Sequence, residues 1–351
     1  MTDSAERYDT MGTLEHVSAA RGAPDIAERI ASLRAWIASD LADVEAELAS
    51  LERGEDPMRA AARHLLSQGG KRLRPLCVAL ASRVGAGFDA RARDLAVAAE
   101  LVHDATLLHD DVVDLGDLRR GAPAARVVYG NTASIFAGDW LLVEGISRIR
   151  RTGLDDLLDR ALDVLRQMLA GEALQLAARG RVPQGTEAYF RVVEGKTASL
   201  FRWALFAGAR AGGLNPAHCA LLEGYGGKMG VAFQVMDDVL DLVGDHAELG
   251  KEVFSDLREG KLTHPVMVAV ERDPRVRALL EEALAHEGRA LDPALLRAVS
   301  AALRETGAAE ESRELALRLV REAVSTLGEL PPGRARDSLA DVALAMVDRR
   351  K

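Results

Sequence analysis

Hydrophobic side chains recur at helical spacing along almost the whole chain. In residues 26–51 they stand three or four positions apart, at Ile26, Ile30, Leu33, Ile37, Leu41, Val44, Leu48 and Leu51. Since an α-helix completes a turn in about 3.6 residues, this spacing places them on one face of a helix that begins after Pro24. The amphipathic pattern indicates that this face packs against a core.

Later segments continue in the same way, as long stretches rich in Ala, Leu and Val. Short clusters of glycine and proline interrupt them, among them Gly69-Gly70, Gly121-Ala122-Pro123 and Gly212-Gly213. Alternating polar and apolar residues, which would indicate strands, form no convincing run, and no segment recurs at a fixed period. The pattern therefore predicts an all-α fold, a single large helical bundle.

The first 23 residues differ from the rest of the chain because they are polar and lack periodicity. We expect residues 1–23 to form a disordered N-terminal extension. No linker divides the remainder of the chain, so residues 24–351 are predicted to form one domain of about ten or more helices.

Charge and cysteine content narrow the classes of partner. The formal net charge of -9 argues against nucleic acid or an anionic membrane as a general partner. An anionic substrate would therefore need local clusters of cations, or metal.

Cys77 and Cys219 have neither metal-ligand spacing nor a disulfide framework, and the N-terminus lacks a signal pattern. We expect a cytoplasmic protein with at most peripheral membrane contact.

An acidic motif ends one of the long apolar helices. Asp110, Asp111 and Asp114 stand at spacings of three and four, so their carboxylates share one helix face and repel one another. Magnesium suits such a site, because it binds one or two carboxylates together with phosphate oxygens and water. Arg119 and Arg120 come next and are suited to bind phosphate. A single triplet of this kind is more often a solvated helix end.

The same spacing returns 127 positions later (237 minus 110), at Asp237, Asp238 and Asp241. This second triplet also lies in an apolar helix, predicted over residues 230–243. Two such motifs on separate helices are able to face each other across a bundle, as carboxylate metal sites do. Coincidence is now the weaker interpretation, and the pair predicts a site for several Mg²⁺ ions around one diphosphate.

Cations near glycine turns complete the candidate chemistry. Lys71 and Arg74 come after Gly69-Gly70 and lead into a helix whose backbone amides would favour phosphate. The spacing differs from a Walker A loop. Each taken alone would be an ordinary surface residue, but lysines recur directly after glycine, at Lys196, Lys251 and Lys261. His103 lies two helical turns before Asp110, where an ordinary core histidine would be the simpler interpretation.

These motifs and their order resemble those of the trans (all-E) polyprenyl diphosphate synthases of the isoprenoid synthase family. The resemblance runs from about residue 25 to the C-terminus and rests on five motifs. They are Gly69-Gly70-Lys71-x-x-Arg74-Pro75, Asp110-Asp111-x-x-Asp114 with Arg119-Arg120-Gly121, Glu194-Gly195-Lys196-Thr197, Gly230-x-x-x-Gln234-x-x-Asp237-Asp238-x-x-Asp241, and Gly250-Lys251 with Asp256-x-x-Glu259-Gly260-Lys261-x-Thr263.

The resemblance implies a role for each matching residue. The diphosphate of isopentenyl diphosphate would be bound by Lys71, Arg74, His103 and Arg120. The allylic diphosphate would be bound by Arg119, Lys196, Lys251 and Lys261. Thr197 and Gln234 would face the carbocation. Magnesium, with three ions per site when substrate is bound, would be held by Asp110, Asp111, Asp114, Asp237, Asp238 and Asp241. A proton would leave to the released diphosphate.

Two residues depart from the family pattern. Phe254 stands where glycine is usual in the loop after Lys251, and Asp104 comes after His103 where a small polar residue is commoner. Both put the local loop and rim geometry in doubt more than the reaction.

Product length is expected to depend on the residues just before the first motif. Ala105 and Thr106 lie one turn before it, and the resemblance implies that a large aromatic side chain there stops growth early. Ala105 leaves the passage open, and Val102 and Ala98 are also small. We therefore predict a long-chain product, hexaprenyl to decaprenyl (C30–C50).

Three alternatives compete with this interpretation. A class I terpene cyclase would need an Asn-x-x-x-Ser-x-x-x-Glu second site, which neither Asn131 nor Asn215 fits. A non-catalytic subunit of a heteromeric synthase would be expected to have lost an acidic motif or the lysines. A short-chain farnesyl or geranylgeranyl diphosphate synthase is the closest competitor. The family also suggests a homodimer.

Overall fold

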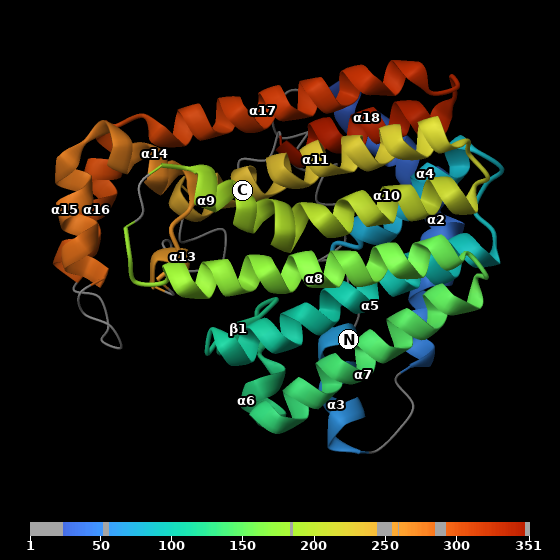
Figure 1. Cartoon of the computed structure of the whole chain (residues 1–351), viewed down its shortest axis with the longest axis horizontal. Helices are drawn as coiled ribbons and strands as arrows, with labels where there is room; N and C mark the ends of the chain where they lie inside the picture. The colour runs from blue at the N-terminus through green and yellow to red at the C-terminus, as the bar shows by residue number, and fades with distance from the viewer. Residues whose placement is uncertain are drawn as a thin grey trace.

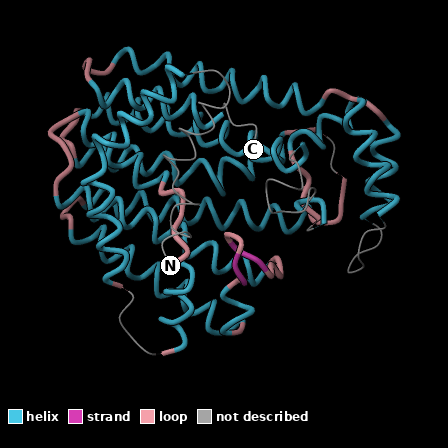
Figure 2. The backbone as a smooth tube through the Cα atoms, turned by 180° about the vertical axis from the view of Figure 1, so that it is seen from behind, coloured by secondary structure: helices cyan, strands magenta, loops and turns pink. Residues whose placement is uncertain are grey.

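The computed structural model describes residues 24–51, 56–182, 185–243, 255–258, 260–284 and 293–347. Helices make up nearly all of them, which confirms the all-α prediction (Figure 2). Those of the first half are α2 (Pro24–Ser50), α3 (Pro57–Leu66), α4 (Leu73–Val84), α5 (Ala90–Val113), α6 (Ala125–Tyr129), α7 (Asn131–Arg151) and α8 (Asp155–Ala178). The predicted extension, residues 1–23, lies outside the described residues.

The second half continues the bundle. Its elements are α9 (Glu187–Val193), the π-helical turn η2 (Glu194–Ala198), α10 (Ser199–Ala211), α11 (Pro216–Val243), α13 (Ser255–Arg258), α14 (His264–Arg272), α15 (Pro274–Leu284), α16 (Pro293–Glu305), α17 (Ala308–Thr326), the 3-10 turn η3 (Leu327–Glu329) and α18 (Arg334–Val347). The helices α8, α10, α11 and α17 run side by side across the molecule (Figure 1).

The hydrophobic pattern of the first helix is confirmed. Ile30, Leu33, Ile37 and Val44 are at most 2% exposed, so the face with that spacing is the one that packs on the core. Helix α5 is different, because α4, α7 and α10 all pack against it. Consecutive residues of α5, from Leu95 to Ala99, are fully buried. Its Ala-rich sequence therefore reflects a helix surrounded by other helices.

A short hairpin is a feature of the described chain that the helical pattern did not indicate. Strands β1 (Leu118–Arg119) and β2 (Ala122–Pro123) pair in antiparallel register across Arg120 and Gly121. Both turn residues have positive φ, 51° and 76°, as a two-residue type I′ turn requires. Strands of two residues are too short to show alternation. The hairpin holds the Arg119-Arg120 pair beside the first acidic motif.

The C-terminal part of the bundle carries a second, smaller hydrophobic cluster. It joins α13, α14, α15 and α16, with Val266, Val276, Leu280 and Val299 in its interior. Figure 1 shows α15 and α16 at one end of the molecule, away from α2 and α4. None of the described helices is long and apolar enough to cross a membrane.

Candidate active site

The first acidic motif lies in the last turn of α5 and is surrounded by cations. Arg119 of the hairpin donates to Asp111 Oδ1 from Nε at 2.9 Å and from Nη2 at 2.5 Å. Asp114 is bound by Arg179, at the end of α8, and by Lys261, whose Nζ lies 2.5 Å from Asp114 Oδ2. The mutual repulsion of the three carboxylates is thus offset by cations from three separate segments.

These neighbours act differently on the two outer carboxylates. Burial raises the pKa of Asp110 in spite of the attraction of Lys196, and the nearby Glu172 adds to the rise. Burial also opposes charge on Asp114, but hydrogen bonds from Lys261 and Arg179 outweigh it and lower the pKa of that carboxyl. Asp114 is therefore held ionised, as a ligand for a cation must be.

A π-helical turn joins the first motif to the second. Lys196 lies in η2, and its Nζ contacts Asp110 Oδ2 at 3.3 Å and Glu172 Oε2 at 2.5 Å. The next residue, Thr197, donates from Oγ1 to Gln234 Oε1 of α11 at 3.1 Å. Extra-wide turns of this kind are frequent at functional sites, because they displace a side chain from the regular helical register.

Two glycines allow this turn to lie so close to its neighbours. A Cβ on Gly195 would stand 2.6 Å from Gln167 O of α8, and one on Gly230 of α11 would stand 2.7 Å from Ala198 Cα. Both distances are shorter than any real Cβ contact, so only glycine permits the approach. The glycines of the Glu194-Gly195-Lys196-Thr197 and Gly230 motifs thus place Lys196 and Thr197 between the two acidic helices.

The second acidic motif lies near the end of α11. Asp237 and Asp241 are partly buried, whereas Asp238 is 3% exposed. Both oxygens of Asp238 accept hydrogen bonds, from Tyr189 Oη at 2.6 Å, Gln234 Nε2 at 2.9 Å and the His264 backbone N at 3.0 Å. Burial raises the pKa of Asp238 to about 6 in spite of these donors.

The predicted ligands of the second diphosphate form a cationic cluster next to α5. Burial lowers the pKa of His103 well below its usual value, and the charges of Arg74 and Arg120 lower it further, so its ring is neutral at pH 7. Arg74 lies over the ring of Phe201 at 4.8 Å, and the exposed Lys71 lies 5.9 Å from the ring centre of Phe233. Arg74 thus packs against an aromatic ring, while Lys71 is open to solvent.

Arg120 and the departure at Asp104 are directly connected. Arg120 Nη2 donates to Asp104 Oδ1 at 3.0 Å, and Nη1 donates to Gly69 O of the glycine turn. Arg72, between Lys71 and Arg74, donates to Glu45 and Glu100 at 2.6 and 2.8 Å and lies 3.6 Å from Asp104. These ion pairs give Arg72 a structural role.

Several neighbours of the site were not indicated by the sequence. Arg179, Glu172 and Tyr189 contact Asp114, Lys196 and Asp238 from segments 24 to 65 residues away. Of these three, only Glu172 had a signal in the sequence, because it comes directly after Gly171 within an otherwise regular helix. Lys251 and Phe254 lie outside the described residues.

The residues predicted to line the product passage lie on α5, where it packs against α7. Ala105 is fully buried and Val102 is 4% exposed, while Thr106 Oγ1 donates to His103 O of its own helix. Gly145 of α7 approaches Val102, where an added Cβ would stand 3.6 Å from Val102 Cγ2. Helix α7 therefore packs closely against α5 at the level of Val102.

The donor set fits a metal that shares its coordination with a ligand. Asp111 is 2% exposed and its Oδ2 has no hydrogen-bond partner among the described residues. Within the described residues, no group of three His, Cys, Asp or Glu side chains could hold a metal ion on its own. Magnesium bound by one or two carboxylates and completed by phosphate oxygens agrees with both observations.

Comparison with known proteins gives a consistent result. The family model described as polyprenyl synthetase matches residues 55–301. The chain is 36% identical over 317 residues to heptaprenyl diphosphate synthase component 2 of Geobacillus stearothermophilus, covering 90% of this chain and 98% of that one. It is 34% identical over 316 residues to a short chain isoprenyl diphosphate synthase of Methanothermobacter thermautotrophicus, covering 89% and 96%.

A solved structure also matches over most of its length. The polyprenyl synthase of Caulobacter crescentus CB15, crystallised with calcium and isoprenyl diphosphate, superimposes with a TM-score of 0.85. The two chains are 33% identical, and the match covers 91% of this chain and 97% of the other.

Proposed function

The chain belongs to the polyprenyl synthetase family, and from that premise we propose that it lengthens an allylic prenyl diphosphate with isopentenyl diphosphate to a long-chain all-E product. It is a prenyltransferase. The observation that carries the proposal is the turn η2, where Lys196 contacts Asp110 of the first motif and Thr197 contacts Gln234 of the second. One short segment thus contacts both of the helices that carry the proposed metal ligands.

The metal is proposed to be Mg²⁺, with three ions per site when substrate is bound. Its ligands would come from Asp110, Asp111 and Asp114 on one side and from Asp237, Asp238 and Asp241 on the other. When bound, it neutralises charge on the leaving diphosphate oxygen. The calcium in the Caulobacter crescentus relative supports the use of a divalent ion.

The allylic diphosphate is proposed to bind between the two motifs, where lysine and arginine side chains form ion pairs with the carboxylates of the first motif. Lys196 and Lys261 contact Asp110 and Asp114, and Arg119 contacts Asp111. A diphosphate would exchange these ion pairs for charge-assisted hydrogen bonds to itself. Lys251 is proposed as a fourth cation, and Arg179 joins the set because it shares Asp114 with Lys261.

Isopentenyl diphosphate is proposed to bind at the cationic cluster of Lys71, Arg74, His103 and Arg120. The neutral ring of His103 would donate a hydrogen bond without adding charge, while the guanidinium groups supply the charge. In this proposal the two sites would hold the double bond of one substrate near the allylic carbon of the other. The carbon–oxygen bond of the allylic diphosphate breaks, and the double bond of isopentenyl diphosphate attacks the allylic cation. A proton of the added isopentenyl unit then passes to the released diphosphate, and a new double bond forms.

The oxygens of Thr197 and Gln234 are proposed to stabilise the allylic cation. They lie 3.1 Å apart on η2 and α11, between the two motifs. Fixed dipoles of this kind stabilise developing charge strongly, because they need not reorganise during the reaction.

Product length is proposed to be long, C30 to C50, because Ala105 is small. The named relatives include both a heptaprenyl and a short-chain enzyme, so the proposal rests on the side chains of α5 and not on their names. A short-chain product is the alternative.

A homodimer is proposed from the exposed apolar surface of α6 and α7. Val127, Val128, Ile135, Phe136 and Val143 are 41% to 59% exposed, which is unusual for side chains of this size on adjacent helices. A second copy of the chain would cover them. The relative named "component 2" supports a heteromeric partner as the competing occupant.

The deciding experiment is incubation of the purified protein with Mg²⁺, isopentenyl diphosphate and farnesyl diphosphate, and then product sizing. We expect elongation that is lost on chelation with EDTA and restored by Mg²⁺. The variant Asp111→Ala should nearly abolish turnover, because it removes the carboxylate at the centre of the first motif. A wild-type protein that forms no elongated product would overturn the enzymatic role, and a product of twenty carbons would overturn the long-chain assignment.

A further inference from the structure

The carboxylate of Asp238 is buried and accepts hydrogen bonds from three protein groups. Its two oxygens accept three hydrogen bonds, and the side chain is 3% exposed. Since each oxygen offers about two acceptor positions, protein donors take most of the capacity of this carboxylate, and one position on Oδ1 remains for the proposed metal. Its surroundings are those of a group that orients its neighbours.

The neighbour that Asp238 orients is Gln234, one turn earlier on α11. A side-chain amide has a donating end and an accepting end, and an ionised carboxylate accepts only donors. Because Gln234 Nε2 donates to Asp238 Oδ1 at 2.9 Å, Oε1 must point the opposite way, where it accepts from Thr197 Oγ1 at 3.1 Å. If the amide were reversed, its NH₂ group would point to the place where the cation is proposed to form.

Asp238 is in turn held by Tyr189 of α9, and the tyrosine is braced by aromatic packing. Its ring lies 5.3 Å from Phe190 in an edge-to-face arrangement and 5.4 Å from His264. His264 is itself fixed, since Nδ1 lies 2.8 Å from Ser312 Oγ of α17. Three helices therefore determine the position of one hydroxyl group.

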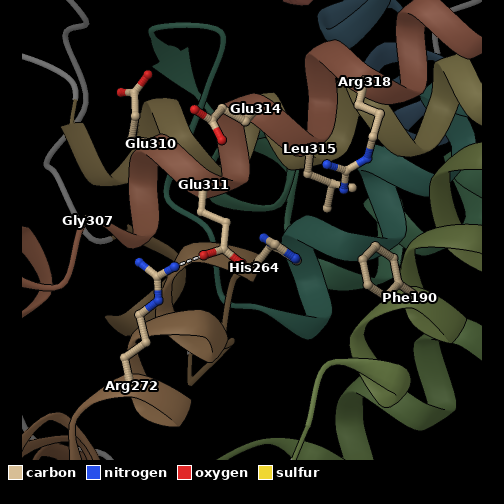
Figure 3. A pocket seen from close by; sticks show the side chains of 9 residues that line it. All are labelled: Phe190, His264, Arg272, Gly307, Glu310, Glu311, Glu314, Leu315 and Arg318. Atoms are coloured by element: carbon tan, nitrogen blue, oxygen red, sulfur yellow. Dashed lines mark hydrogen bonds and ion pairs between the residues drawn. The ribbon is translucent and has the colours of Figure 1, made fainter.

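The outer side of this aromatic group faces a surface hollow. Phe190 and His264 line it together with Arg272, Glu311 and Arg318, and the hollow holds about 620 Å³ (Figure 3). Figure 3 shows the His264 ring between α14 and α17, next to the ion pair of Arg272 and Glu311. The aromatic group thus separates Asp238 from an open, polar surface.

We propose that Tyr189 is a positioning residue of the reaction, which acts through Asp238 to hold the carbonyl oxygen of Gln234 toward Thr197 and the allylic carbon. This inference rests on the proposed function. In the proposed arrangement Tyr189 acts only through Asp238, so loss of its hydroxyl should alter the rate of ionisation and leave diphosphate and metal binding unchanged.

The test is a double-mutant cycle between Tyr189→Phe and Gln234→Ala. The phenylalanine keeps the aromatic packing and removes only the hydroxyl. We expect Tyr189→Phe to lower kcat about tenfold in the wild-type background, with little change in KM for either substrate. In the Gln234→Ala background the same substitution should change kcat by less than about twofold, since no oriented carbonyl remains to be lost.

A second tyrosine of the same bundle supplies the matched control. Tyr225 of α11 is 1% exposed and lies about three turns before Asp237, and its hydroxyl donates to Leu339 O of α18 at 2.7 Å. Tyr225→Phe also removes one buried hydrogen bond. It should lower the melting temperature but leave kcat unchanged within about twofold in both backgrounds.

Three results would decide the matter. Equal losses of kcat in the two backgrounds would overturn the inference while leaving the proposed function intact. A rise in the Mg²⁺ concentration for half-maximal rate in Tyr189→Phe, matching that of Asp237→Asn, would show that Asp238 acts through the metal and would also overturn it. Absence of any turnover in the wild-type protein would instead overturn the proposed function, and the positioning role with it.

Discussion

The residue that departs most clearly from the family pattern, Asp104, lies beneath the proposed isopentenyl diphosphate site. It is fully buried, and Arg120 and Arg72 approach it at 3.0 and 3.6 Å. Burial, with the neighbouring charge of Glu100, raises the pKa of Asp104 to about 6. Asp104 therefore affects the geometry of the rim through Arg120, because its carboxylate determines where the Arg120 guanidinium lies.

The raised pKa of Asp104 predicts a pH dependence of stability. The unfolded chain releases this proton near pH 4, whereas the folded protein keeps it until about pH 6. The contribution of this group to stability therefore falls as pH rises from about 4 to about 6, and is constant above that range. Asp104→Asn cannot titrate, so its melting temperature relative to wild type should increase across this window. A difference that stays flat from about pH 4 to about pH 6 would contradict the prediction.

The π-helical turn η2 is the element that the site depends on most. Its backbone lies so close to α8 that a Cβ on Gly195 would stand 2.6 Å from a backbone oxygen. We predict that Gly195→Ala displaces the turn, destabilises the fold by about 1–3 kcal/mol and lowers kcat sharply, because Lys196 and Thr197 move with it. Denaturant unfolding and steady-state kinetics measure the two effects.

The matched control for this prediction is a glycine in open space. Gly224 lies in α11, and a Cβ there would meet nothing within 4 Å. Gly224→Ala should therefore stabilise the protein by about 0.5–1 kcal/mol, since alanine loses less backbone freedom in a helix. If both alanine variants were equally stable and active, the close approach of η2 to α8 would not matter.

Helix α5 supplies the prediction about product length. Ala105 is fully buried one turn before the first motif, on a helix that α7 and α10 also contact. We expect Ala105→Phe to shorten the main product, because a ring at this position would fill the space that a growing chain enters. Product chromatography measures the change.

The same substitution at the other end of this helix is the control. Ala90 is exposed at the start of α5, so Ala90→Phe should leave product length unchanged. An unchanged product from Ala105→Phe would place the floor of the passage on another helix.

At the scale of the whole molecule, α7 has two faces of different character. Ala137, Leu141 and Gly145 pack inward against α5, while Phe136 and Val143 are 55% and 59% exposed. A helix that is apolar on both faces indicates that the outer face is also covered. In the proposed homodimer a second copy covers it.

This arrangement predicts the effect of a charge on α7. Phe136→Asp should convert the dimer to a monomer, because a buried unpaired carboxylate at an interface is costly. Sedimentation velocity measures the change. Ala301→Asp, at an exposed position of α16 away from α7, should leave the dimer intact (Figure 1). A wild-type chain that sediments as a monomer would contradict the homodimer.

The amino-acid sequence alone determined the features that depend on near neighbours. The face of α2 and the three- and four-residue spacing of each aspartate triplet are local, so periodicity and residue type were enough to predict them. Of the glycine-lysine pairs expected near turns, Gly195-Lys196 lies instead within the continuous helical run of α9, η2 and α10. The all-α fold depends on the same kind of information, since every long segment shows the helical period. Even the importance of Gly195 and Gly230 was visible as part of a motif, although its reason was not.

Only the tertiary structure decided which partners these residues meet. Arg72 has the same chemistry as Arg74 two positions later, yet it faces Glu45 and Glu100, while Arg74 lies over Phe201. Tyr189 reaches Asp238 across 49 positions of chain, and Arg179 reaches Asp114 across 65. Such contacts arise when helices pack, and a helical period states which face is buried but not which helix will cover it.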